Sequence, residues 1–398
     1  MNEVIVAGHI CIDIIPALGD RKGGLEDIMV PGKLVNVGPA VTSTGGVVSN
    51  TGLALHRLGI PTGLMGKVGD DIFGRAILEL LRAYSTALAE GMIVVAGEHT
   101  SYTVTINPPE VDRIFLHYTG ANDTFGADDV DYDKLTGARL FHFGYPPAMR
   151  QMFTNGGAEM ELLFRRVKEK GLTTSLDMAK PDPASEAGQT DWVAFLEAVL
   201  PHVDIVLPTL DEILFMLDRL HYEQMVRRAG SADVVTLADG DLLARMAQRL
   251  IEMGVGIVML KLGDQGMYLR TTSDQERLSN LGRCRLEDPE SWVGREILAP
   301  CFQAEVAGTT GAGDTTVAGF LAALIAGLSP QAASTSAVAV GACSVEQPDA
   351  TSGVPSWDQV QNRILRGWAR RKMSLNLTGW RWDQRSALWL GPNDQVGS

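Results

Sequence analysis

One glycine-rich string ends in a carboxylate and runs directly into an apolar helix. The string Gly308-Thr309-Thr310-Gly311-Ala312-Gly313-Asp314 precedes an expected helix over 315–328. Glycines let the backbone approach a ligand without an obstructing Cβ, and free amides at a helix start create a small positive volume. Such a nest suits a phosphate, or a phosphoryl group that gains charge during transfer. Because phosphate repels a carboxylate, Asp314 at the rim suggests a proton acceptor for an attacking hydroxyl.

The same string also fits a tight strand–helix turn in which Asp314 is only an N-cap. Known nucleotide motifs do not decide between the two interpretations. The sequence contains no G-x-x-x-x-G-K-[ST], no complete G-x-G-x-x-G, and neither of the kinase triplets H-R-D and D-F-G. If the chain handles nucleotide phosphates, it does so by another route.

Short β-rich runs alternate with helix-period stretches along most of the chain. This alternation predicts βαβ units and a largely parallel sheet covered on both faces. The expected strands of this sheet are 4–7, 64–68, 140–143, 173–176, 205–207 and 256–260. Strands at 92–96, 101–106 and 113–117, with part of 11–37, have no intervening helices, so we expect them to form a small separate sheet, a lid. The polar segment 271–300 is expected to be an inserted excursion.

Composition excludes several classes of protein. The chain has 398 residues and a formal charge of −14, with 45% hydrophobic and 21% charged residues, which is typical of a soluble enzyme. An acidic chain argues against nucleic-acid or anionic-membrane partners, because phosphate neutralisation needs a basic surface. The longest apolar run, 317–328, is too short to span a bilayer. Four widely spaced cysteines and no signal-peptide pattern predict a reducing, cytoplasmic location.

Two long motifs, in this order, resemble the signatures of the ribokinase-like (PfkB-type) carbohydrate kinases. TTGAGDTTVAGF at 309–320 is similar to the C-terminal signature. GGVVSN at 45–50, followed by GKVGDD at 66–71 and Gly74, is similar to the N-terminal one. The resemblance implies an α/β fold: a three-layer Rossmann-like sandwich with a mostly parallel central sheet and a small β-sheet lid. It implies a kinase domain over 1–366, with lid segments near 14–44 and 92–120, and leaves 367–398 as a Trp-rich C-terminal extension.

On the acceptor side, the resemblance implies that Asp13 and Asn50 hydrogen-bond to substrate hydroxyls. Gly45 and Gly46 would let backbone amides contact the sugar, and the loop residue Asn122 would read further hydroxyls. Each has a structural alternative. Asp13 is otherwise a charged residue that ends an edge strand, and Asn50 an ordinary residue at a helix start. Gly45 and Gly46 otherwise form a tight turn, and Asn122 lies in a plain loop. These alternatives stay open at the level of sequence.

On the nucleotide side, the resemblance makes Asp314 the catalytic base and Gly311, Ala312 and Gly313 the anion hole. The turn KLGDQG at 261–266 resembles the strand–turn–strand beside the nucleotide. The expected nucleotide-binding residues are Lys261, Gly263, Gly266 and Thr310. A plain hairpin turn is the alternative for that segment.

Mg²⁺ is implied at Glu212, through water, because Mg²⁺ sheds its hydration shell reluctantly. The family's Asn-x-x-Glu pattern reads here as Thr209 to Glu212, and a Glu in the first turn of a capped helix is the alternative. A second departure is Gly308, where the family commonly has an Asp that helps to hold a monovalent cation. Activation by K⁺ is therefore doubtful.

The predicted function is ATP-dependent phosphorylation of a hydroxymethyl group of a sugar or sugar-like alcohol. A nucleoside or other hydroxymethyl acceptor is the first alternative, and a non-catalytic sugar-binding relative is the second. The expected partners are a small-molecule sugar and ATP, with no nucleic acid and no membrane. A homodimer through the lid or the tail is possible. Four tryptophans after Arg366 are expected to pack on the body or on a second subunit.

Overall fold

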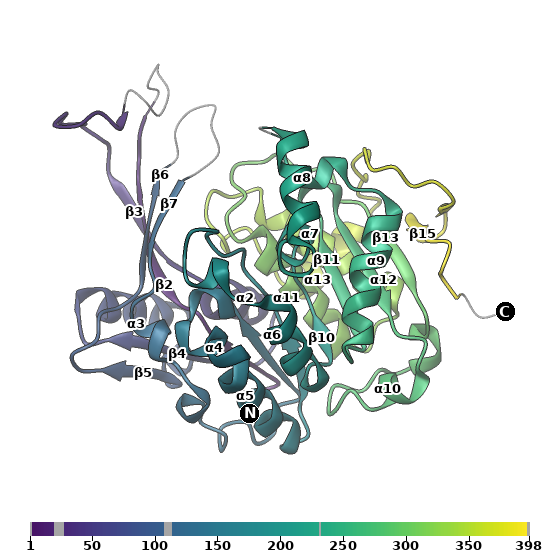
Figure 1. Ribbon diagram of the computed structural model, residues 1–398, viewed down its shortest axis with the longest axis horizontal. Coiled ribbons are helices and arrows are strands. Elements are labelled where there is room, and N and C mark those ends of the chain that lie inside the picture. Colours follow the sequence, from purple (N-terminus) through teal and green to yellow (C-terminus); the bar gives the residue numbers. More distant parts are fainter. Residues whose placement is uncertain (1, 20–27, 107–113, 231, 396–398) are drawn as a thin grey trace.

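The computed structural model describes residues 2–19, 28–106, 114–230 and 232–395 (Figure 1). It contains an 11-stranded central sheet with helices on both faces, and a separate 4-stranded sheet that projects from one end of the body. The predicted α/β sandwich with a small lid sheet is confirmed. Within the described ranges, no helix has the length and apolar character needed to cross a membrane.

The elements have the following bounds. The strands of the central sheet are β1 (Val4–Gly8), β4 (Thr62–Gly69), β5 (Met92–Val95), β8 (Leu140–Gly144), β9 (Thr173–Leu176), β10 (Ile205–Val206), β11 (Ile257–Lys261), β12 (Met267–Thr271), β13 (Glu296–Ala299), β14 (Arg381–Asp383) and β15 (Leu388–Leu390). The lid strands are β2 (Cys11–Pro16), β3 (Ala40–Gly45), β6 (Tyr102–Ile106) and β7 (Ile114–Tyr118). The helices are α2 (Val47–Arg57), α3 (Ile72–Tyr84), α4 (Arg150–Phe153), α5 (Ala158–Glu169), α6 (Trp192–Val199), α7 (Leu210–Leu217), α8 (Arg219–Ala229), α9 (Gly240–Glu252), α10 (Gln275–Ser279), α11 (Ala312–Ile325), α12 (Pro330–Ser344) and α13 (Trp357–Leu365).

The central sheet is parallel over most of its width. Its order is β14-β15-β13-β12-β11-β10-β9-β8-β1-β4-β5, and the strands from β11 to β5 pair in parallel. Successive side chains of a strand point to opposite faces. Ile5 and Ala7 of β1 therefore pack into the core with α5, α6, α7 and α9, whereas Val4 and Val6 pack into the core with α2, α11 and α12. Burial on both faces explains why these strands read as continuous apolar runs.

Two predictions about the strands were wrong. The strand expected in the lid at 92–96 is β5, which pairs in parallel with β4 at the edge of the central sheet. The reason is that α3 lies between β4 and β5, so the three elements form an ordinary βαβ crossover. The segment 271–300, expected to be an excursion, contains α10 and ends in β13, which pairs with β12. The lid is therefore built from β3, β2, β6 and β7 alone.

The C-terminal extension continues the central sheet. β15 pairs with β13 and β14 pairs with β15, at the right of Figure 1. Trp380 is buried against the body, and Trp368 stacks on Phe302 with ring centroids 4.5 Å apart. The prediction that tail tryptophans pack on the body is confirmed for these two.

A buried ion pair connects the end of the C-terminal extension to the body of the protein. Arg295 Nε lies 2.8 Å from Asp394 Oδ1, and the two side chains are 4% and 2% exposed. Asp394→Ala should lower the free energy of unfolding by about 3 kcal/mol, because it leaves a buried guanidinium without its carboxylate. Urea denaturation of the intact chain measures this change.

The matched control for that substitution is Asp70→Ala, because the Asp70–Arg75 pair at 3.4 Å is solvent-exposed and should contribute little. If both variants lowered stability equally, the buried pair would not be what fastens the extension.

Candidate active site

Helix α11 begins at a glycine N-cap, and of its first amides that of Ala312 donates to Thr309 O at 3.3 Å. Gly311 is the N-cap with φ 69°, and no side chain in the described part of the chain caps this helix. A Cβ at Gly311 would lie 2.4 Å from the Cβ of Ala350, so only glycine fits. Gly311, Ala312 and Gly313 have the shape expected of an anion nest. Anion binding there stays a prediction.

Asp314 follows this nest and is 5% exposed. Asn50 Nδ2 donates to Asp314 Oδ2 at 3.0 Å, and the Thr51 hydroxyl donates to Oδ1 at 3.4 Å. The Tyr145 hydroxyl also donates to Oδ1. Three donors from α2 and from the loop after β8 therefore fix the orientation of a buried carboxylate. The N-cap alternative does not apply, because Gly311 is the cap and Asp314 lies in the first turn.

The two asparagines predicted on the acceptor side differ in what they can still bind. Asn50 Oδ1 is buried without a hydrogen-bond partner among the described residues, so it remains able to accept a bond from a ligand hydroxyl. Asn122 is fully buried, and its amide is occupied by the backbone of Ile10, with Ile10 N donating to Oδ1 at 3.2 Å and Nδ2 donating to Ile10 O at 2.9 Å. We therefore withdraw Asn122 from the acceptor site. It fixes the chain between β1 and β2 instead.

Asp13 lies directly against Gly45, and the neighbouring Gly46 lies against His9. A Cβ on Gly45 would lie 2.4 Å from Asp13 Oδ2, and one on Gly46, at φ +86°, would lie 2.5 Å from His9 Nδ1. Burial raises the pKa of Asp13, and the charge of Asp314 raises it further, whereas bonds from Cys11 and Thr103 oppose this rise. Asp13 and Asp314 thus interact electrostatically. This agrees with their assignment to one site.

Lys261, at the end of β11, forms a buried pair with Asp177, and Lys261 Nζ lies 2.7 Å from both carboxylate oxygens. Burial alone would lower the pKa of Lys261, but Asp177, Glu212 and Asp314 together raise it. The end of the Lys261 side chain also lies beside Gly313, since a Cβ on Gly313 would be 3.8 Å from Lys261 Nζ. A fixed positive charge therefore lies beside the nest at α11.

Glu212 belongs to the same group of charges and also caps α7. Thr209 N donates to Glu212 Oε2 at 2.7 Å, and Glu212 N donates to Thr209 Oγ1 at 3.2 Å, which is a capping box. The capped-helix alternative is thus present, and a metal role for Glu212 stays a prediction. Burial is the main reason that the pKa of Glu212 is raised to about 8, with Lys261 opposing this shift and Asp177 adding to it.

A cavity of about 310 Å³ lies between the Lys261 turn and α11. Its lining includes most of the residues predicted to bind the nucleotide and one arginine from the extension; among them are Thr209, Lys261, Gly263, Gly266, Gly313 and Arg371. Thr309 lines this cavity, whereas the predicted Thr310 does not. Gly263–Gln265 forms a short turn between β11 and β12, which confirms the expected strand–turn–strand.

Two site residues were not predicted from the sequence. Tyr145 directly follows β8, at a sheet edge where ligands bind in open α/β folds, and that position was the available signal. Arg371 had no motif to mark it. His142, on β8 itself, is a core residue instead: it is fully buried, bonds to Ser175 Oγ at 2.8 Å, and has a pKa lowered to about 3 by burial and by Lys261.

Gly308 is packed too closely to carry a side chain. A Cβ there would lie 2.7 Å from the carbonyl oxygen of Pro348. An acidic residue could therefore not occupy this position without a shift of the backbone.

Comparison with known proteins agrees with this geometry. The model of the pfkB family carbohydrate kinases matches residues 1–357. An uncharacterized sugar kinase of Archaeoglobus fulgidus is 27% identical over 304 residues, which cover 76% of this chain and 98% of that protein. A ribokinase of Arabidopsis thaliana, solved with ribose and ATP, has a TM-score of 0.66 at 19% identity and covers 91% of this chain and 98% of its own. A fructokinase of Xylella fastidiosa with bound ATP has a TM-score of 0.66 at 17% identity, over 92% and 99% of the two chains.

The family match covers most of the chain, and the fold and the two motifs agree with it. The chain belongs to the pfkB family of carbohydrate kinases. It is accordingly a phosphotransferase that uses ATP and a carbohydrate hydroxyl as acceptor. The resemblance stated from the two sequence motifs is confirmed.

Proposed function

We propose that this enzyme phosphorylates a hydroxymethyl group of a sugar or sugar-like alcohol, with Asp314 as general base. The observation that carries this proposal is a buried Asp314 carboxylate held by Asn50 and Tyr145 at the start of α11. The base is oriented before the substrate arrives, which reduces the cost of alignment in the transition state. The amides from Gly311 to Gly313, of which that of Ala312 also donates to Thr309 O at 3.3 Å, would stabilise charge on the transferring phosphoryl group.

Acceptor binding is assigned to Asp13 and Asn50. Asp13 can accept bonds from hydroxyls, and Asn50 Oδ1 has no other partner among the described residues. Gly45 and Gly46 let the backbone lie directly against Asp13 and His9, where a Cβ would clash. Polar groups of this kind favour a sugar over a planar base, which would require aromatic or apolar walls.

Mg²⁺ fits the donor set beside the nucleotide cavity. Glu212 and Asp177 offer carboxylate oxygens, the ligands that Mg²⁺ prefers. A single Lys261 faces three carboxylates there, since its pKa is raised by Asp177, Glu212 and Asp314. This excess of negative charge suits a cation, and we assign Glu212 to it, through water. When bound, Mg²⁺ offsets the charge of the phosphate oxygens.

Acceptor identity is the direct test of the proposed function. ADP release should depend on an added sugar in a panel that includes ribose, fructose and adenosine, and NMR of the product should show phosphate on a CH₂OH carbon. Turnover with adenosine, but with neither ribose nor fructose, would show that the acceptor is a nucleoside and not a sugar. ATP binding without ADP release under any acceptor would contradict the proposal.

Asp314→Asn should lower kcat by ~10²–10⁴, because an amide cannot take the hydroxyl proton. ATP binding, followed by calorimetry, should remain near wild type. The asparagine keeps the shape of the side chain and an oxygen that can accept from Tyr145.

The matched control for Asp314→Asn is Asp358→Asn, since Asp358 also lies in the first turn of a helix, α13, but is exposed. Near wild-type turnover in Asp314→Asn would remove Asp314 from its role.

The close packing of Gly308 against Pro348 supports a kinase that does not need K⁺. Replacing Na⁺ by K⁺ at constant ionic strength should leave kcat nearly unchanged. A large gain in rate would show that other residues hold an activating cation.

We also propose that the enzyme forms a homodimer through the lid, and that it is located in the cytoplasm. Leu116 and Tyr118 of β7 are 48% and 42% exposed, and they lie on the face of the strand opposite to His117. The C-terminal extension packs on its own body instead. All four cysteines are free, which suits a reducing compartment. Sedimentation velocity of the intact chain tests the dimer.

A further inference from the structure

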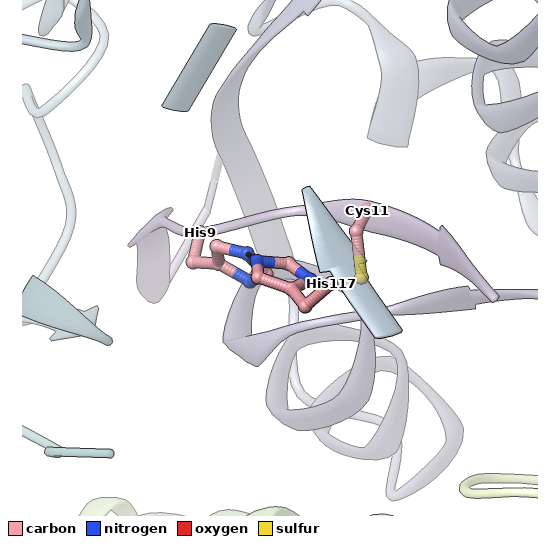
Figure 2. Close-up of side chains that lie close together, drawn as sticks. All are labelled: His9, Cys11 and His117. Atoms are coloured by element: carbon pink, nitrogen blue, oxygen red, sulfur yellow. Dashed lines mark hydrogen bonds between the residues drawn. The ribbon is translucent and has the colours of Figure 1, made fainter. Parts of the chain in front are cut away.

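Two histidines and a cysteine meet where the lid joins the body. His9 lies between β1 and β2, Cys11 begins β2, and His117 belongs to β7 (Figure 2). One potential ligand atom from each of the three lies within 4.8 Å of the others. We call His9, Cys11 and His117 the His–Cys cluster. It is separate from the charges around Lys261 and from Glu212, the residue assigned to Mg²⁺.

Strand register brings the cluster together. Asp13 of β2 pairs with Thr103 of β6, and Thr103 pairs with His117 of β7. Cys11 is two residues before Asp13 and therefore shares its face of β2. The Cys11 sulfur lies 3.4 Å from Asp13 Oδ1 and 3.5 Å from Thr103 Oγ1. The Asp13 carboxylate thus lies next to the Cys11 sulfur.

We propose that the His–Cys cluster binds a divalent ion of the zinc class through two imidazoles and one thiolate, with water at the fourth position. Imidazole nitrogen, thiolate sulfur and carboxylate oxygen are the donors that zinc takes in tetrahedral sites. His9 Nε2 and His117 Nε2 are 3.3 Å apart. Two nitrogens bound at the usual zinc distance in a tetrahedron are also about 3.3 Å apart. The sulfur needs to move by no more than about 1 Å to complete the tetrahedron.

The surroundings prepare both rings to act as ligands. Burial lowers the pKa of His9, and the charge of His117 lowers it further. Burial also lowers the pKa of His117, although Asp123 opposes this shift. Both shifts favour the neutral imidazole, which is the form that metals bind. His117 Nδ1 lies 3.0 Å from Thr103 Oγ1, so a proton on Nδ1 leaves the Nε2 lone pair directed at His9. His9 Nδ1 is buried and has no hydrogen-bond partner among the described residues. No bond at Nδ1 therefore prevents His9 from carrying its proton there, which leaves the Nε2 lone pair free as in His117.

Charge balance favours a divalent ion over a monovalent one. Burial raises the pKa of the Cys11 thiol, which keeps its proton without a metal, and Asp13 raises it further. Binding forms the metal–sulfur bond and releases that proton to water. The thiolate and the Asp13 carboxylate then offset the two charges of the ion.

Occupancy should compete with the acceptor, a consequence that rests on the proposed function. Asp13 is assigned to the acceptor hydroxyls, and its carboxylate lies 3.4 Å from the sulfur that would bind the ion, so the charge of the ion would draw Asp13 away from the acceptor. The ion would also tie His117 of the lid strand β7 to His9 next to β1. A zinc-class ion would thus act as an inhibitor competitive with the sugar.

Cobalt titration of the intact chain, without nucleotide or sugar, tests the metal site directly. One equivalent of Co²⁺ should produce a thiolate-to-cobalt charge-transfer band, and added Zn²⁺ should remove it. Cys11→Ser should abolish the band, and His117→Gln should weaken Zn²⁺ binding at least about tenfold, measured by calorimetry. Circular dichroism confirms that each variant is folded.

Matched controls are available elsewhere in the chain. Cys343→Ser should keep the band, because Cys343 is a free, buried cysteine outside the cluster, and His56→Gln, in the last turn of α2, should keep Zn²⁺ affinity. Absence of the band in the wild type, or its survival in Cys11→Ser, would overturn the site. If the band forms but the accepted sugar does not displace the metal, the competition with the acceptor is wrong. If no acceptor is phosphorylated at all, the proposed function fails while the cobalt result still stands.

Discussion

The hydrogen bond between Asn50 and Asp314 is the contact on which the active site depends. The two residues are 264 positions apart, and the bond joins α2 to α11. A carboxylate removed from water must be matched by donors, because an unpaired buried charge is costly. Asn50, Thr51 and Tyr145 supply those donors. The proposed base is therefore oriented by packing of α2 against α11, and Asp13 lies within range of its charge.

The charges around Lys261 show how the site is suited to a polyphosphate and a cation together. Lys261 is held by Asp177 and is further influenced by Glu212 and Asp314. Burial raises the pKa values of Glu212 and Asp177. Without ligands the group of charges around Lys261 has fewer positive than negative members, which lowers the stability of the folded protein. Binding of a metal–nucleotide complex would supply positive charge near the carboxylates and negative charge near the lysine and the α11 amides.

Sequence predicted those parts of the fold and site whose signal is local. The nest before Asp314, the Lys261 turn and the glycines beside Asp13 each lie in one continuous motif, and the structure gives each the expected backbone. Tyr145 was missed because its role depends on which helix covers the end of β8. Asn122 was misjudged because its partner, the backbone of Ile10, is distant in the chain. The edge position of β5 and the sheet formed by the extension likewise depend on pairing, which period-two patterns do not encode.

The lid shows most clearly why strand register, and not motif, sets the acceptor pocket. Ser43, Asp13, Thr103 and His117 are paired in one row across β3, β2, β6 and β7. Their neighbours in the next row are Ile14, Val104 and Leu116, which point to the opposite face. A slip of one residue at β6 or β7 would exchange these rows and turn apolar side chains toward Asp314. The family motifs carry the residues proposed for phosphoryl transfer. In the proposed acceptor pocket, the surroundings of Asp13 are determined by this row, whose members come from four strands and share no contiguous motif.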